Sequence, residues 1–120
     1  MKKILHIEDE VDQVTLVRAL LERRGYEVLS AKNAQEGLEK ATKEKPSLIL
    51  LDVFLPKSSG FELCKQLRES FETKNIPIIM VTGSGDKHIE EQCKNAGANG
   101  CLVKPFVPED LISKIEGAIQ

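Results

Sequence analysis

Short apolar runs alternate along the chain with longer segments in which apolar residues recur every three or four positions. Short runs of this kind are typical of strands, and the spacing in the longer segments is typical of helices with one buried side. The third and fourth runs are apolar throughout, which indicates strands covered on both faces. We therefore expect strands over residues 3–7, 26–30, 47–51, 76–81 and 100–103.

The longer segments predict helices that alternate with these strands. Asn33 and Asp86 are suited to cap two helices at their N-termini, because a short polar side chain can accept a hydrogen bond from a free backbone N–H group. Gly25 and Gly97 stand where two helices end, and Pro108 falls in the first turn of the last helix. We expect helices over residues 10–24, 34–43, 60–70 and 87–95, and from residue 108 onward.

Strand and helix thus alternate five times. This order favours a parallel sheet, because parallel strands are joined by helical crossovers. Such crossovers are right-handed, so we expect a doubly wound α/β sheet with helices on both faces. The length of 120 residues suits a single domain spanning residues 1–120.

Composition narrows the class of protein. Hydrophobic residues make up 41% of the chain and charged residues 30%, the balance of an ordinary globular protein. The formal net charge of −2 and the lack of a basic stripe argue against direct binding to nucleic acid. No apolar run is long enough to span a bilayer and no signal-peptide core is present, so we expect a cytoplasmic protein without membrane contact. Three widely spaced cysteines favour buried small side chains over a disulfide framework or a zinc site.

Charged and hydroxyl side chains stand at the carboxyl ends of the expected strands. Glu8 and Asp9 follow the first strand, Asp52 the third, Thr82 the fourth and Lys104 the fifth. Ligands of doubly wound sheets bind at these ends, so we expect the five side chains to line one cleft. Clustered carboxylates repel one another, and Mg²⁺, which prefers oxygen ligands, relieves that repulsion. An aspartate carboxylate can attack phosphorus while a metal and a lysine stabilise the transferring oxygens.

Four motifs stand in order at these strand ends: I-E-D-E at 7–10, L-L-D-V-F-L-P at 50–56, V-T-G at 81–83 and L-V-K-P-F at 102–106. On these motifs the whole chain resembles the receiver domains of bacterial two-component response regulators, and among them the chemotaxis receivers. The resemblance implies a flavodoxin-like (βα)5 fold with a five-stranded parallel sheet in the order 2-1-3-4-5.

The resemblance also implies a role for each matching residue. Asp52 would be the phosphoacceptor, and Thr82 would be the switch hydroxyl that moves toward the phosphoryl group. Lys104 would pair with a phosphoryl oxygen and would be joined to Pro105 by a cis peptide bond.

The same resemblance implies a site for Mg²⁺ or Mn²⁺. Asp9 and Asp52 would bind the ion directly. Glu8 would bind the ion or hold a water molecule on it, and the backbone carbonyl of Phe54 would complete the site.

A domain of this family is a phosphorylation-controlled signalling module. The resemblance implies that a histidine kinase or a histidine phosphotransfer protein supplies the phosphoryl group. The chain would catalyse its own phosphorylation and slow dephosphorylation without turning over a separate substrate. Its surface at the fourth helix, fifth strand and fifth helix would then bind a downstream effector domain or protein, and a phosphorylation-dependent homodimer stays open as an alternative.

Two positions depart from the usual pattern of the family. Glu8 stands where most members have aspartate, and its extra methylene group would either shift the metal or favour water-mediated contact with it. Cys101 stands where the family has a tyrosine or phenylalanine that swings inward as Thr82 moves. The switch would therefore run through loop movement alone or through Phe106.

Other interpretations remain open from the sequence alone. Acids after the first strand can simply cap a helix, and Asp52, Thr82 and Lys104 can each be an ordinary loop residue. A small Mg²⁺-dependent aspartyl-phosphate phosphatase is one alternative function, although Val53 stands where such enzymes have a second acid. A flavodoxin-like cofactor binder is another, although acids stand where it would need a phosphate-binding loop.

Overall fold

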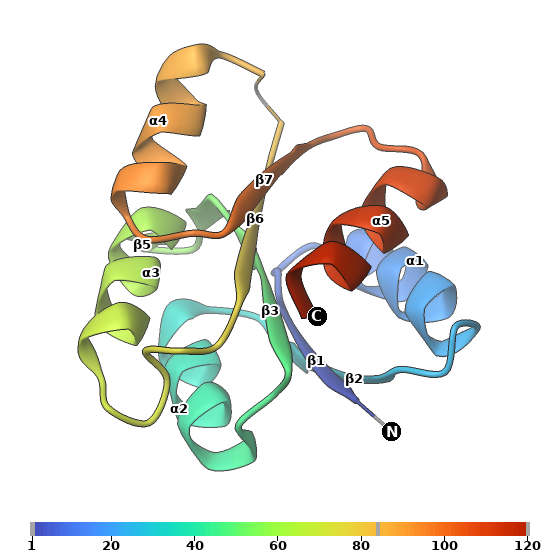
Figure 1. The fold of residues 1–120 in the computed structure, drawn as a ribbon, viewed down its shortest axis with the longest axis horizontal. Helices are drawn as coiled ribbons and strands as arrows, with labels where there is room; N and C mark the ends of the chain where they lie inside the picture. The colour runs from blue at the N-terminus through green and yellow to red at the C-terminus, as the bar shows by residue number, and fades with distance from the viewer. Residues whose placement is uncertain (1, 84, 120) are drawn as a thin grey trace.

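The computed structural model describes residues 2–83 and 85–119. Within these ranges five strands form one parallel sheet in the order β2-β1-β3-β6-β7 (Figure 1). The strands are β1 (Lys3–Ile7), β2 (Glu27–Ala31), β3 (Leu48–Asp52), β6 (Ile78–Thr82) and β7 (Gly100–Val103). When only the strands of this sheet are numbered the order is 2-1-3-4-5, so the predicted doubly wound fold is confirmed.

The helices of the described ranges are α1 (Val11–Glu22), α2 (Ala34–Glu44), α3 (Gly60–Glu69), α4 (Lys87–Asn95) and α5 (Pro108–Ile119). The predicted end signals are confirmed. The side chain of Asn33 accepts a hydrogen bond from the N–H of Glu36 at the start of α2, and Gly25 has a φ of 89° after α1. Among the described residues, no helix combines the length and the apolar character needed to cross a membrane.

Several element boundaries differ from the prediction. β2 and β3 begin and end one residue later, β6 begins two residues later and ends one residue later, and α1 begins one residue later and ends two residues earlier. Pro77 has no N–H group to donate to the ladder, so β6 begins at Ile78. The ladder joins backbone groups, so it continues through polar residues. Asp52 and Thr82 are therefore still part of β3 and β6, as their last residues.

A short antiparallel hairpin lies between β3 and α3, where the sequence predicts no strand. It consists of β4 (Phe54–Leu55) and β5 (Ser58–Ser59), and Lys57 in its turn has a positive φ of 57°. Strands of two residues are too short to show an alternating pattern, and lysine is not a residue that signals positive φ. The hairpin therefore leaves no trace in the sequence.

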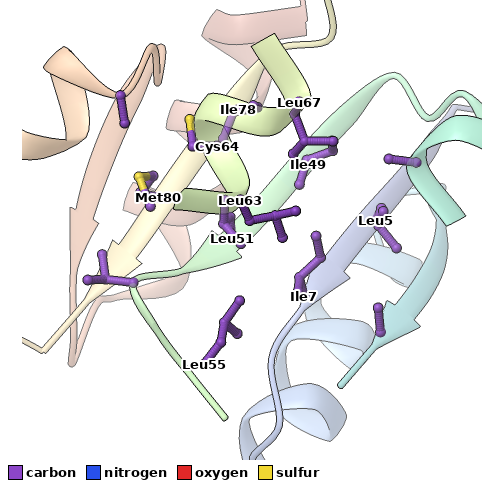
Figure 2. Packing of buried hydrophobic residues seen from close by; sticks show 14 of the residues in the cluster. Leu5, Ile7, Ile49, Leu51, Leu55, Leu63, Cys64, Leu67, Ile78 and Met80 are labelled. Carbon is purple, nitrogen blue, oxygen red and sulfur yellow. The ribbon is translucent and has the colours of Figure 1, made fainter. Parts of the chain in front are cut away.

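Two hydrophobic clusters lie on the two faces of the sheet. α2, α3 and α4 cover one face, and α1 and α5 cover the other (Figure 1). Because successive strand residues point to opposite faces, Ile49 and Leu51 of β3 belong to the α3 side, and Leu48 and Leu50 belong to the side of α1 and α5. Figure 2 shows Leu63 of α3 packed with Ile49 and Leu51. Each buried side chain of this size contributes roughly 1.5–3 kcal/mol, so β3 is firmly held from both faces.

The guanidinium group of Arg68 ties α3 to the loops that lead into β6 and β7. Its Nε donates to the carbonyl oxygen of Gly97 at 2.8 Å, and its Nη1 donates to that of Ile76 at 2.7 Å. Its Nη2 donates to Oδ1 of Asn99 at 2.8 Å, and the same oxygen accepts from the N–H of Ile78 at 2.8 Å. Charged donors that are partly buried need such acceptors, and these hydrogen bonds hold the starts of β6 and β7 against α3.

The N-terminus of α3 lies directly against the carboxyl end of β3. The N–H of Gly60 donates to the carbonyl oxygen of Val53 at 2.7 Å. A Cβ atom on Gly60 would lie 2.2 Å from the carbonyl oxygen of Asp52 and 2.9 Å from Cα of Val53. Only glycine fits this approach, so Gly60 allows α3 to support the backbone of Asp52.

We expect Gly60→Ala to lower the free energy of unfolding by about 2–4 kcal/mol, because the added methyl group overlaps backbone atoms that cannot rotate away. Gly117→Ala is the matched control, since nothing lies within 4 Å of a Cβ there and the residue is inside α5. This control should gain about 0.5–1 kcal/mol from helix propensity. Urea unfolding measures the free energy of unfolding of both variants. Equal stabilities would contradict the close approach of Gly60 to the backbone of Asp52 and Val53.

Candidate functional site

The register of β1 and β3 brings two buried carboxylates together. Ile7 pairs with Leu51 in the parallel ladder, so the next residues, Glu8 and Asp52, lie side by side at the carboxyl end of the sheet. Glu8 is only 3% exposed and Asp52 only 7%, whereas the following acid, Asp9, is exposed. The three acids offer carboxylate oxygens that lie within 4.8 Å of one another.

The ends of β6 and β7 add a hydroxyl group and an ammonium group to this edge. Asp52 pairs with Val81, the residue before Thr82, and Thr82 in turn pairs with Val103. The N–H of Lys104 donates to the carbonyl oxygen of Thr82 at 2.7 Å. Thr82 is fully buried at the carboxyl end of β6.

The ammonium group of Lys104 is shared between the two buried carboxylates. Its Nζ lies 3.0 Å from Oε1 of Glu8 and 3.4 Å from Oδ2 of Asp52. The remaining oxygens accept from backbone groups: Oε2 of Glu8 from the N–H of Glu10 at 3.3 Å, and Oδ1 of Asp52 from the N–H of Phe54 at 3.2 Å. One cation thus faces two anions, and the pair of carboxylates is left short of positive charge.

The lack of positive charge affects the pKa of Asp52 most strongly. Burial and the neighbouring Glu8 carboxylate raise the pKa of Asp52 to about 6, although Lys104 and the N–H of Phe54 oppose the change. Burial also disfavours the charged form of Glu8, but its hydrogen bonds with Asp52 and Lys104 outweigh burial and lower the pKa of Glu8. Burial works against the charged form of Lys104 as well, yet the two carboxylates raise its pKa. Lys104 and Glu8 are therefore charged at neutral pH.

His6 does not supply the missing charge. It lies in β1 and is 3% exposed, and burial lowers its pKa to about 4 even though Glu8 acts in the opposite direction. The imidazole is therefore neutral at neutral pH. In the described part of the chain, no hydrogen-bond partner lies within reach of its Nδ1.

The donor set fits a hard divalent cation. All side-chain donors of the cluster are carboxylate oxygens, the ligands that Mg²⁺ prefers, and a cation beside Asp52 would relieve the repulsion that raises its pKa. Phe54 lies on β4 with its side chain 66% exposed. The role of its carbonyl oxygen stays a prediction, as do the roles of Glu8, Asp9 and Asp52 as ligands.

Two parts of the site escaped the reasoning from sequence. Gly60 supports the backbone of Asp52, and the N–H of Glu10 holds one oxygen of Glu8. The sequence does contain a signal for Gly60, because this glycine stands at the first position of a predicted helix. The N–H of Glu10 leaves no signal in the sequence, because every residue except proline carries a backbone N–H group. The peptide bond between Lys104 and Pro105 is cis, as the family resemblance implied.

Comparisons with known proteins agree with this geometry. A family model described as the response regulator receiver domain matches residues 4–116. The chain is 40% identical over 119 residues to the alkaline phosphatase synthesis transcriptional regulatory protein PhoP of Bacillus subtilis, covering 99% of this chain and 49% of PhoP. It is 34% identical over 119 residues to protein PilH of Pseudomonas aeruginosa, covering 99% of this chain and 98% of PilH. The chain thus spans about half the length of the transcriptional regulators it matches and nearly all of PilH.

Solved structures share the fold of this chain. The receiver domain of the sensor histidine kinase PA1611 from Pseudomonas aeruginosa PAO1 is 28% identical and superposes with a TM-score of 0.91, covering 98% of this chain and 97% of that chain. That structure has a magnesium ion coordinated in the active site cleft.

The pKa of Asp52 leads to a pH-dependent expectation for the metal-free chain. A carboxyl whose pKa is raised to about 6 in the folded state, from 3.8, binds its proton more tightly when folded. Its stabilising contribution is therefore complete below pH 4 and is lost as the pH rises through 6. Asp52→Asn should raise the free energy of unfolding at pH 7 by about 2–3 kcal/mol, and this gain should vanish below about pH 4.

Urea unfolding in EDTA at several pH values between 4 and 7 measures this difference. Asp12→Asn, which changes an exposed acid in the first turn of α1, is the control and should show no comparable gain. A variant at Asp52 that is no more stable than the parent at pH 7 would show that its carboxylate is not under strain.

Proposed function

Because the chain belongs to the family of response regulator receiver domains, we propose that it accepts a phosphoryl group on the Asp52 carboxylate. The observation that most strongly supports this proposal is the position of Asp52, buried with Oδ2 at 3.4 Å from Nζ of Lys104 and next to Glu8 and Asp9. A buried carboxylate, an ammonium group and a cluster of acids suited to a divalent cation lie at one edge of the sheet, and this supports phosphoryl transfer to the carboxylate.

In the proposed reaction an oxygen of Asp52 attacks phosphorus. The bond from phosphorus to the donor breaks as the bond from phosphorus to the Asp52 oxygen forms, which yields an acyl phosphate. Lys104 is already held at this position by two ion pairs, so little reorganisation is needed for it to stabilise the charge on a phosphoryl oxygen. Thr82 lies one residue beyond the partner of Asp52 in the ladder, which suits it to donate to another oxygen.

We propose that Mg²⁺, or Mn²⁺ in its place, binds at the acid cluster. Asp9, Asp52 and the carbonyl of Phe54 would hold the ion, and Glu8 would either join them or hold a water molecule on the ion. When bound, the ion would offset the repulsion between carboxylates and draw charge from the phosphoryl oxygens. Glu8 already has its Oε1 on Lys104, which favours the water-mediated role.

The proposed output is a change in the surface formed by α4, β7 and α5. Phosphorylation would draw the Thr82 hydroxyl toward the phosphoryl group and shift the population toward a second arrangement of the loop that leads into α4. Phe106 packs on the side of α1 and α5, whereas Cys101 packs on the side of α4. Phe106 is therefore poorly placed to act on α4, and this supports loop movement alone as the route.

Receiver domains of response regulators interact with histidine kinases and effectors. For this chain we propose a histidine kinase or a histidine phosphotransfer protein as the phosphoryl donor. A downstream effector domain or protein, or a second phosphorylated copy of the chain, would bind the altered surface. The chain would catalyse its own phosphorylation and slow dephosphorylation rather than turn over a separate substrate.

We expect about 10 mM Mg²⁺ to raise the melting temperature of the unphosphorylated chain by several degrees. A site half-saturated near 1 mM would add about 1.4 kcal/mol to the free energy of unfolding at that concentration. Asp52→Asn and Asp9→Asn should lose most of this rise. Glu10→Gln changes the third acid of the same run, lies outside the cluster and should keep the rise. Thermal melts in KCl of equal ionic strength provide the baseline, and an equal rise in the Asp52 variant would place the cation elsewhere.

We expect acetyl phosphate with Mg²⁺ to add the mass of one phosphoryl group to the parent chain and none to Asp52→Asn. The variant should be folded, since the change removes a strained carboxylate. Asp12→Asn is the control and should be labelled like the parent. Intact mass spectrometry reports the label, and labelling that persists in Asp52→Asn would refute the assignment of the phosphoacceptor.

A further inference from the structure

Two thiol groups meet on the side of the sheet that α4 covers. Cys93 lies in the last turn of α4 and Cys101 is the second residue of β7, and their Sγ atoms are 3.5 Å apart. α4 packs beside β7, so both elements hold this contact (Figure 1). The third cysteine, Cys64, is fully buried in α3.

The turn between α4 and β7 fixes this contact. The two cysteines are eight residues apart, and Gly97 between them has a φ of 101°, which reverses the chain after α4. Arg68 holds the carbonyl of Gly97 and the side chain of Asn99, which places the start of β7. The sulfur atoms need to approach by only about 1.5 Å more to reach the length of a disulfide bond.

The thiol pair is open to small molecules from solvent. Cys93 is 2% exposed, but Cys101 is partly exposed. Both line a surface cavity of about 380 Å³ whose wall also includes Lys94 and Lys114. A small oxidant can therefore reach Cys101, with Cys93 directly behind it.

We propose that Cys93 and Cys101 are a redox-active pair that a peroxide oxidises to an intramolecular disulfide, fastening α4 to β7. The sulfur of Cys101 attacks one oxygen of the peroxide, the O–O bond breaks, and Cys101 becomes a sulfenic acid as water leaves. The sulfur of Cys93 then attacks the sulfur of Cys101, its proton goes to the departing hydroxide, and a second water leaves. Two thiols are oxidised and one hydrogen peroxide is reduced to two waters.

The order of these steps follows from the surroundings of the two sulfur atoms. Burial, together with the hydrogen bond to Cys101, raises the pKa of Cys93 to about 12. Cys93 therefore stays a thiol and donates its S–H to Cys101, and the partly exposed Cys101 is the sulfur that an oxidant reaches first.

The disulfide would join two elements of the surface to which the proposed function assigns partner binding. Only this consequence rests on the proposed function, because the oxidation itself involves neither Asp52 nor phosphorylation. A chain that is labelled by acetyl phosphate but forms no disulfide, and a chain that shows the reverse, would therefore separate the two proposals.

Peptide mapping of the full chain tests the proposal. The reduced protein is treated with one equivalent of hydrogen peroxide, alkylated and digested with trypsin without reductant. Cleavage after Lys94 separates Cys93 in residues 88–94 from Cys101 in residues 95–114, because the bond between Lys104 and Pro105 resists trypsin, and Cys64 falls in residues 58–65. We expect a disulfide-linked pair of peptides 88–94 and 95–114, a fall from three free thiols to one, and full reversal by dithiothreitol.

Variants make the assignment specific. Cys64→Ala should form the linked pair as the parent does, whereas Cys101→Ala, at a partly exposed position, should lose it. Oxidation should also slow hydrogen exchange of the α4 amides in the parent and in Cys64→Ala, but not in Cys101→Ala. Sulfinic acid at Cys101 with peptide 88–94 still alkylated, a link between two chains, or unchanged exchange in α4 after oxidation would each overturn the proposal.

Discussion

The parallel register of four strands is the constraint on which the candidate site depends. Glu8, Asp52, Thr82 and Lys104 each stand at the end of a strand or one residue beyond it. In a parallel sheet a shift of one residue turns every side chain of a strand to the opposite face. Such a shift in β3 would exchange Ile49 and Leu51 for Leu48 and Leu50 in the two clusters, and helices on both faces oppose it. Packing of the core thus sets the spacing of the charged groups.

The excess of negative charge at the candidate site lowers the stability of the folded chain and also favours the binding of a divalent cation. Two buried carboxylates share one ammonium group, and the neighbouring imidazole of His6 is neutral. The resulting rise in the pKa of Asp52 reflects stability lost when its carboxylate is charged, and the same excess of negative charge favours a divalent cation. Arg68 is the contrast, because each of its nitrogens donates to an oxygen and its charge serves the fold. The carboxylate of Asp52 therefore destabilises the fold, whereas the guanidinium group of Arg68 stabilises it. This contrast is consistent with a functional site that lowers the stability of the protein.

The side of the sheet beneath α4 links the two proposals. The family resemblance predicts a large aromatic ring at the position of Cys101, but here the sulfur of Cys101 lies 3.5 Å from the sulfur of Cys93. Phe106 belongs to the opposite face and does not replace that ring. The proposed connection between Thr82 and α4 would therefore run through the backbone, and the proposed bond between the two sulfur atoms would act directly on it.

The sequence by itself determined the element order, the fold class, the strand order through family resemblance, and the identity of the acids, the threonine and the lysine at the strand ends. These features are local or periodic, because caps, turns and apolar runs depend on residues close together in the chain. The tertiary structure alone decided which oxygen of Glu8 pairs with Lys104, how far the pKa of Asp52 rises, why Gly60 must be glycine, and that Cys93 meets Cys101. The short hairpin β4–β5 belongs to the same group. Distances, burial and the balance of neighbouring charges arise only when strands distant in sequence pack together, so no pattern along the chain contains them.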